Sequence, residues 1–366
     1  MKREEQADIL LSLCNHALLG KGAASVGDVA AREWDGILYF ASLQGVLPAI
    51  WPLLVNLRVD DERSRMKMVR WYVAAQDSMK QYKLRVYMMQ ELTAILAEAG
   101  IDVMFLKGAA LAQLYPRPEW RAFSDIDFYL YGKSELGVEA MIRHGIEKLE
   151  TDHHHVRLSL NGVLLENHYN FVERTNHRCN VVLDDTLKAL AESEGRSARA
   201  DFIKGSHRNA YVMTPTMNAI FLMRHMSTHF ASETISLRML YDWALFLREH
   251  GEDVDWKMVT GLYERSGMSL FAGIIQRLLL SHLESDCKAC PIAPGSKELA
   301  EKVWKSIIHP SEHNPYEEGS PRYYLSEART FLANRWKYRM VYPDESYTLL
   351  MFKYAWAAKK KFFSCF

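Results

Sequence analysis

Residues 103–131 decide the fold, and they read VMFLKGAALAQLYPRPEWRAFSDIDFYLY. The run from Val103 to Leu106 is short and apolar, which suits a buried strand. Residues 109–115 have the pattern of a short helix, and Pro116 and Pro118 break it. Residues 126–131 alternate between the two faces of a second strand. The segment therefore predicts strand, short helix and strand in succession.

The same mixed pattern continues toward residue 213. Residues 134–149 suit a helix that begins at a Ser N-cap, Ser134. Two alternating runs, 156–160 and 163–171, flank Asn161-Gly162, and such a pair between alternating runs is a strong hairpin signal. Residues 100–213 are therefore expected to form a small mixed sheet with helices.

Both flanks of this region are helical in pattern. Residues 1–99 are predicted as an N-terminal helical segment, whose long last helix over residues 61–100 ends at Gly100 as a C-cap. Residues 214–366 are predicted as a C-terminal helical domain. Its four clearest amphipathic segments are residues 216–230, 236–250, 255–267 and 269–283. The fold class expected is α+β, with helices on both sides of a small mixed sheet.

Composition narrows the function classes. The 366 residues hold 45 basic and 45 acidic side chains, so the formal net charge is zero. A dedicated nucleic acid binder usually carries a basic excess, so a long nucleic acid substrate is disfavoured relative to a small molecule or a protein. The N-terminus is not a signal peptide, and no apolar run reaches the roughly 18 residues of a membrane span. Five cysteines form no disulfide framework, so a cytoplasmic location is expected.

Asp125 and Asp127 carry the most informative chemistry. Strand residues two apart point the same way, so both carboxylates share one face. Such a pair repels itself unless a cation sits between, and Mg²⁺ takes one or two carboxylates together with substrate phosphates. Gly108 precedes them at a strand-to-helix turn, where phosphate can approach the backbone. A metal–triphosphate site, with Mg²⁺ or Mn²⁺, is predicted.

Glu166 is the candidate for a third carboxylate. Alternation in residues 163–171 places Leu164, Glu166 and His168 on one face. A buried and unpaired carboxylate costs several kcal/mol, so a metal partner for Glu166 is a reasonable expectation. It would complete a second metal site or serve as the base for phosphoryl-type transfer.

These motifs resemble the nucleotidyltransferase superfamily built on the DNA polymerase beta core. Its pattern is a strand-ending Gly, a short helix, Asp-x-Asp and a lone carboxylate on a later strand. Within it, the chain is similar to a bacterial family of uncharacterised nucleotidyltransferases, in a resemblance that spans roughly residues 85–285. Its marks are Leu106-Lys107-Gly108, Leu111, Tyr115-Pro116, Arg121, Asp125-Ile126-Asp127, Pro215, His225, His229, Leu237-Arg238, Asp242 and Asp255-Trp256.

The resemblance implies metal-dependent transfer of an NMP group from an NTP, with ATP expected, to an acceptor hydroxyl with release of pyrophosphate. Asp125, Asp127 and Glu166 would then be both catalytic and metal-binding. The expected nucleotide contacts are Lys107, Gly108, Ala109, Arg121, His229, Arg238 and Asp242. Two departures stand out: Ala109 replaces the Ser common after the Gly, and Glu166 stands where Asp is commoner.

Several features keep a plainer interpretation. His225 and His229 fit core or nucleotide-contacting histidines better than a metal pair, and Arg238 with Asp242 fits a helix salt bridge or a cleft lining. His153 to His155 and Cys287-x-x-Cys290 are weak metal signals. The basic tail around Lys359–Lys361 is expected to be a frayed helix end, with peripheral membrane contact as the alternative.

Two other functions stay open. An Asp-x-Asp sugar transferase would also bind metal and a nucleotide diphosphate, but it needs a sizeable α/β unit before the motif. A non-catalytic relative would bind nucleotide without turnover. The sequence leaves the acceptor unassigned.

Overall fold

The computed structural model describes residues 1–23, 29–57, 59, 61–152, 154–175, 177–204, 209–285, 289–310, 315–317, 320–343 and 345–347. Helices and a six-stranded mixed sheet make up this part of the chain, which confirms the α+β prediction. His153, Cys287 and the tail at Lys359–Lys361, which the sequence raised as weak signals, lie outside the described residues.

The sheet has the order β3-β4-β5-β2-β1-β6. Strand β2 lies at its centre, antiparallel to β1 and parallel to β5. The predicted hairpin is confirmed: β4 and β5 are antiparallel, and Asn161 and Gly162 have φ of 51° and 78°, the positive values that a tight hairpin turn requires. The strands are β1 (Val103–Phe105), β2 (Asp125–Tyr129), β3 (Glu147–Thr151), β4 (His155–Leu160), β5 (Val163–His168) and β6 (Ala210–Val212).

One predicted helix is too long. Residues 134–149 divide into helix α6 (Ser134–Arg143) and edge strand β3, because the chain turns at Gly145 with φ of 81°. Ser134 is the first helical residue and not the N-cap, and its hydroxyl accepts a hydrogen bond from Asn167 Nδ2 at 2.8 Å. Helix α7 (Arg178–Ser193) and strand β6 were not predicted.

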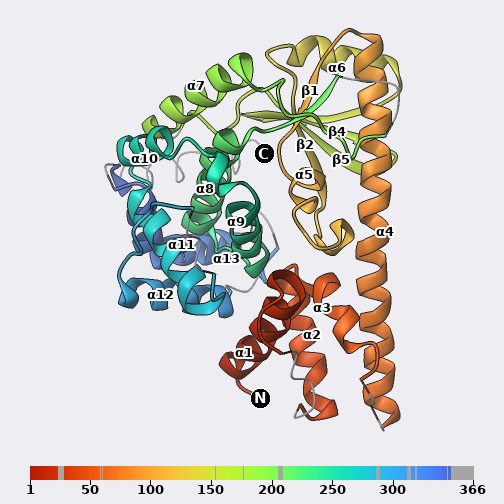
Figure 1. Cartoon of the computed structure of the whole chain (residues 1–366), viewed down its shortest axis with the longest axis vertical. Coiled ribbons are helices and arrows are strands. Elements are labelled where there is room, and N and C mark those ends of the chain that lie inside the picture. The colour runs from red at the N-terminus through yellow and green to blue at the C-terminus, as the bar shows by residue number, and fades with distance from the viewer. Residues whose placement is uncertain are drawn as a thin grey trace.

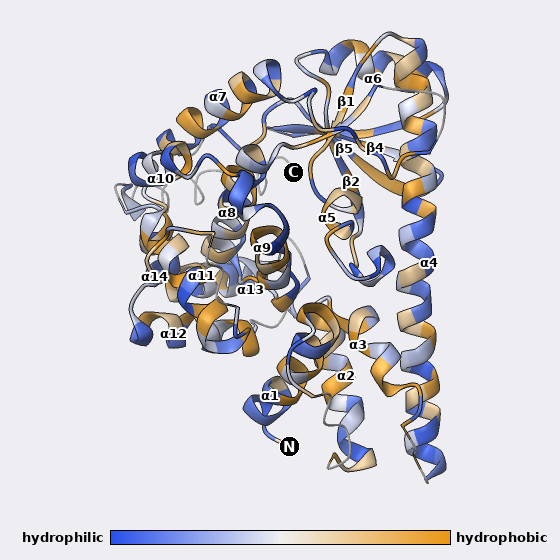
Figure 2. Ribbon diagram, viewed as in Figure 1, coloured by the Kyte–Doolittle hydropathy of each residue, from blue (hydrophilic) through white to orange (hydrophobic). Residues whose placement is uncertain are grey.

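Helix α4 (Glu62–Glu98) connects the two ends of the molecule (Figure 1). Its 37 residues span about 55 Å at 1.5 Å per residue. In its first half Trp71 Nε1 donates to Asp35 of helix α2 at 2.9 Å. In its second half Leu92 and Leu96 are buried against the sheet. Figure 2 shows hydrophobic and hydrophilic bands alternating along the helix, as its two different packing surfaces require.

The other helices lie in the regions expected to be helical, but the short helix after β1 ends earlier than the predicted residue 115. Those of the N-terminal segment are α1 (Arg3–Cys14), α2 (Trp34–Leu43) and α3 (Leu47–Leu54), and α5 (Ala109–Ala112) follows β1. The C-terminal helices are α8 (Pro215–Ser232), α9 (Leu237–His250), α10 (Trp256–Arg265), α11 (Ser269–His282), α12 (Lys297–Ile308), α13 (Pro321–Ala333) and α14 (Arg335–Val341). In the described part of the chain, no helix combines the length and apolar character needed to cross a membrane.

The buried apolar side chains form two clusters on opposite faces of the sheet. One joins Phe105 and Phe128 to α4 and α6. The other holds Met104 and Tyr129 and continues through the N- and C-terminal helices. Tyr241 of α9 donates to the Asn15 side chain at 2.7 Å within it. The three-part division at residues 99 and 213 stays a prediction, and the terminal helices share one core.

Candidate active site

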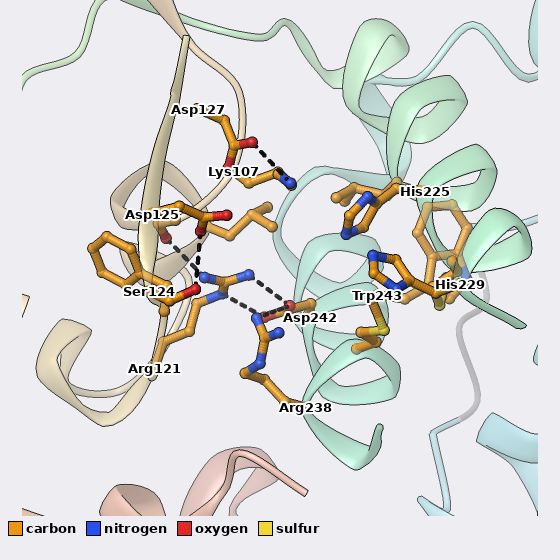
Figure 3. Close-up of a pocket in the computed structure, with 16 residues that line it drawn as sticks. Lys107, Arg121, Ser124, Asp125, Asp127, His225, His229, Arg238, Asp242 and Trp243 are labelled. Atoms are coloured by element: carbon orange, nitrogen blue, oxygen red, sulfur yellow. Dashed lines mark hydrogen bonds and ion pairs between the residues drawn. The ribbon is translucent and has the colours of Figure 1, made fainter. Parts of the chain in front are cut away.

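A cavity of about 190 Å³ lies between the sheet and helices α8 and α9 (Figure 3). Of the residues predicted to form the site, all except Ala109 and Glu166 line it. The core contributes Lys107, Gly108, Leu111, Arg121, Phe123, Ser124, Asp125 and Asp127, and the two helices contribute Leu222, His225, Met226, His229, Arg238, Met239, Asp242 and Trp243. Residues more than 100 positions apart in the chain thus meet in one place.

Gly108 forms the turn between β1 and the short helix α5. Its φ of 54° lies in the region that favours glycine, and a Cβ there would meet the Phe123 ring at 3.0 Å. This turn therefore requires glycine for a conformational and a steric reason, and Gly108 lines the cavity. Ala109, next along the chain, is instead buried in the core with Phe105 and Phe128.

Asp125 and Asp127 lie two residues apart on β2, as predicted. Asp127 is only 4% exposed, and its Oδ1 lies 3.0 Å from both Lys107 Nζ and His168 Nε2. Its Oδ2 is buried and has no hydrogen-bond partner among the described residues. Burial opposes ionisation of Asp127, but Lys107 and His168 outweigh it and hold the pKa far below its usual range. Asp127 is therefore an ionised carboxylate, and one of its buried oxygens, Oδ2, accepts no hydrogen bond from the described residues.

Asp125 faces the cavity more openly. Its Oδ1 lies 3.4 Å from the Ser124 hydroxyl. Burial and the nearby Asp127 carboxylate raise the pKa of Asp125. A cation between the two carboxylates would remove this repulsion. The unmatched Asp127 Oδ2 and the raised Asp125 pKa together fit a divalent ion at this face, with Asp125 and Asp127 as its oxygen ligands.

Glu166 lies directly beside Asp127, because the two are register partners in the parallel pair β2–β5. Glu166 already has a counter-charge, because Arg157 Nε on β4 donates to its Oε1 at 3.1 Å. A metal is therefore not needed to neutralise its charge. Donor atoms of Asp127, Glu166 and His168 nevertheless all lie within 4.8 Å of one another.

Arg121 and Asp242 form a buried bridge between the sheet domain and α9. Arg121 is 3% exposed, and its Nε and Nη2 donate to the two Asp242 oxygens at 2.8 Å each. Its Nη1 donates to the Gly108 carbonyl at 3.1 Å, and the Tyr115 hydroxyl also donates to Asp242. Arg121 was expected to contact phosphate, but three of its donors are occupied in this bridge. It therefore holds the Gly108 turn against α9.

Arg238 contacts Asp242 less closely than Arg121 does. Its Nη1 is 3.7 Å from Asp242 Oδ2, the helix pair expected from their spacing, and its side chain is 25% exposed. Burial and the nearby Arg121 lower the pKa of Arg238. An anion in the cavity would relieve the repulsion between these two cations.

His225 and His229 project from α8 toward the cavity on the side opposite Lys107 (Figure 3). Their ring centroids are 4.5 Å apart, and His225 stacks on Phe221. Burial, then Lys107, lower the pKa of His229 to about 4 and that of His225 well below its usual value. Both rings are neutral at pH 7. Neither belongs to a group of possible metal ligands among the described residues.

The sequence did not assign several residues that complete this site. Alternation placed His168 on the Glu166 face without a role, and the pairing of β5 with β2 brings it beside Asp127. Tyr115 was one of the residues that carry the family resemblance, but no role in the site was predicted for it. Trp243, Met239 and Phe123 line the cavity, and as isolated apolar residues they carried no signal distinguishable from core.

The family is identified by comparison with known proteins. A family model described as "Uncharacterised nucleotidyltransferase" matches residues 30–282. This chain therefore belongs to that family, which confirms the resemblance and makes nucleotidyl transfer its general class of reaction. The chain matches no curated protein and no solved structure.

Proposed function

We propose that this member of the uncharacterised nucleotidyltransferase family binds an NTP, with ATP as the first candidate, through a divalent metal at Asp125 and Asp127. It then moves the NMP group to a hydroxyl of a small molecule or protein. The observation that carries this proposal is the convergence in one cavity of the Gly108 turn, both carboxylates and the cations Lys107 and Arg238. Cys14 and Cys179 are free thiols in the described part of the chain, which agrees with the proposed cytoplasmic setting.

Each side chain has a role that follows from its contacts. Gly108 lets the phosphates approach the backbone, and Arg238 offers charge from α9. Lys107, released from Asp127, contacts phosphate. Arg121 and Asp242 act as positioning residues, since their bridge fixes Gly108 against α9. Neutral His229 is placed to donate a hydrogen bond to the nucleotide.

The transfer is a displacement at the α-phosphorus. The acceptor oxygen forms a bond to that phosphorus as the bond to the pyrophosphate oxygen breaks. The acceptor proton passes to a carboxylate or to water; Glu166 either accepts this proton or serves as a metal ligand, the two roles that the resemblance gives it. A divalent ion at Asp125 and Asp127 would supply charge neutralisation and in-line orientation.

Thermal melting with each NTP, with and without Mg²⁺ or Mn²⁺, followed by a pyrophosphate release assay, tests the proposal. We expect metal-dependent stabilisation by at least one NTP, and pyrophosphate release with a suitable acceptor that Asp127→Asn abolishes while the fold is retained. Turnover at the wild-type rate by Asp127→Asn would contradict it.

The alternatives make different predictions in the same assays. A non-catalytic relative would show nucleotide binding without release across broad acceptor pools. A sugar transferase would be stabilised by nucleotide sugars in preference to NTPs. The helices that precede β1 do not provide the α/β unit such an enzyme needs before its Asp-x-Asp.

A further inference from the structure

We infer that Asp127, Glu166 and His168 form a mixed carboxylate–imidazole site for a first-row divalent transition ion, with His168 as a nitrogen ligand. The inference deepens the proposed function, because it names the ion class and an additional ligand at the same face of the sheet. It concerns metal binding and not transfer, so the two can be tested separately.

The spacing of the donor atoms fits one ion. His168 Nε2 lies 3.0 Å from Asp127 Oδ1 and 3.9 Å from Glu166 Oε2. Adjacent ligands on an ion with bonds of about 2.1 Å lie about 3.0 Å apart in octahedral geometry. The His168 ring and the Asp127 carboxylate already lie at this spacing, and a small shift of Glu166 would complete the set.

The backbone holds these three side chains together. Asp127 and Glu166 are register partners across β2 and β5, and Glu166 and His168 are two apart on the same strand. All three side chains therefore project from one face of the centre of the sheet. Ligands on adjacent strands are positioned more rigidly than ligands on loops.

Unmatched polar atoms point to a missing ligand. Within the described part of the chain, Asp127 Oδ2 is buried without a hydrogen-bond partner, as is Nε2 of His155, a residue that is 3% exposed. His155 Nε2 is directed at the cluster, since it lies 3.8 Å from Glu166 Oε1. Lys107 and Arg157 pair with the other carboxylate oxygens, Asp127 Oδ1 and Glu166 Oε1. These cations therefore leave Asp127 Oδ2 for an ion.

The imidazole decides the class of ion. Mg²⁺ prefers oxygen ligands and binds imidazole poorly, whereas Mn²⁺, Co²⁺ and Zn²⁺ accept nitrogen together with carboxylate. A site with His168 in place of a further carboxylate should therefore discriminate against Mg²⁺. Mn²⁺ is the most useful probe, because it also accepts phosphate oxygens and has an electron paramagnetic resonance signal.

The test is pulsed electron paramagnetic resonance of Mn²⁺ bound to the full chain without nucleotide. We expect nitrogen coupling to the ion in the wild type and a change to the ¹⁵N pattern when histidine is ¹⁵N-labelled. His168→Gln should remove the coupling and weaken Mn²⁺ binding roughly tenfold or more. His144→Gln, at an exposed histidine that directly follows α6, is the matched control and should change neither.

A second cluster, Asp152 with His154 and His155, is the rival nitrogen source. Coupling that survives in His168→Gln, disappears only in His154→Gln, or is absent from the wild type would overturn the inference. If His168→Gln does not fold, the labelled wild type and His154→Gln still decide between the clusters. Nitrogen coupling without any nucleotidyl transfer would contradict the proposed function alone, and transfer with Mg²⁺ without nitrogen coupling would contradict this inference alone.

Discussion

Lys107 and Asp127 form an ion pair of 3.0 Å at the edge of the cavity, with the Lys107 side chain 15% and the Asp127 side chain 1% exposed. The cation beside the predicted metal-binding carboxylate is thus supplied by the chain itself. An incoming metal would compete with the Lys107 ammonium for Asp127. Once displaced, that ammonium would be available to the triphosphate.

Lys107→Met should lower the stability of the metal-free protein and increase its response to metal. Loss of the ammonium leaves His168 as the polar partner of Asp127 among the described residues, at a cost on the order of 1–3 kcal/mol. Added Mn²⁺ no longer competes with Lys107, so its stabilising effect should grow. Chemical denaturation with and without Mn²⁺ measures both quantities. Equal unfolding free energies for variant and wild type would contradict the role given to this pair.

Arg121→Met and Asp242→Leu should each destabilise the protein by about 3–5 kcal/mol, because each leaves a buried charge without its main partner. The double variant should cost less than the sum of the two, since it removes both charges. Denaturant unfolding of the four proteins gives this coupling directly. Arg117→Met, at an exposed arginine of the same segment, is the control. Simple additivity would show that the bridge is not a coupled unit.

Gly108→Ala should destabilise the protein more than Gly145→Ala. Both glycines have positive φ, so both substitutions carry the backbone cost of about 1–2 kcal/mol. Only at Gly108 does the new Cβ meet another group, the Phe123 ring at 3.0 Å, whereas nothing lies within 4 Å at Gly145. Gly108→Ala should also weaken nucleotide binding, and Gly145→Ala should not. Unfolding curves and nucleotide titrations of the two variants provide the comparison, and equal effects would contradict it.

His229 should make stability depend on pH between about 6.5 and 4. Burial lowers the pKa of His229 to about 4, against 6.5 for the unfolded chain. Below pH 6.5 the unfolded chain therefore takes up a proton that the folded protein does not, so stability is retained above 6.5 and falls as the pH drops toward 4. His229→Gln should remove part of this loss, on the order of 1 kcal/mol after allowance for partial exposure. Melting temperatures measured across this range would contradict the assignment if wild type and variant stayed parallel.

The turns, the hairpin and the amphipathic helices could be predicted from the sequence, because short-range residue patterns determine them. The Gly108 turn, the Asn161-Gly162 hairpin and the amphipathic helices α8 to α11 each combine a periodic apolar pattern with a residue that ends it. Strand β3 was missed because all its residues are exposed, so no burial pattern marks it. Helix α7 was missed because the polar residues Asn180 and Asp184 are among those on its buried face.

The candidate site divides in the same way. Asp125, Asp127 and Glu166 share one sheet face through alternation, which a sequence displays directly. The partners of these residues do not follow from local pattern: Arg121 meets Asp242 at 121 positions' separation, and Arg157 meets Glu166 through strand pairing. These tertiary contacts give Arg121 a carboxylate partner in Asp242, and they give Glu166 a counter-charge in Arg157.

Calorimetric titration of a non-hydrolysable ATP analogue tests the central claim, metal-dependent nucleotide binding at Asp125 and Asp127, most directly. Asp125→Asn is the informative variant, because it leaves the Lys107–Asp127–His168 contacts in place. Asp77→Asn, at an exposed acid on α4, is the control. We predict binding by the wild type and Asp77→Asn only when Mg²⁺ or Mn²⁺ is present, and at least tenfold weaker binding by Asp125→Asn, about 1.4 kcal/mol. Equal affinity in all three proteins, or binding unaffected by removal of the metal, would contradict the account.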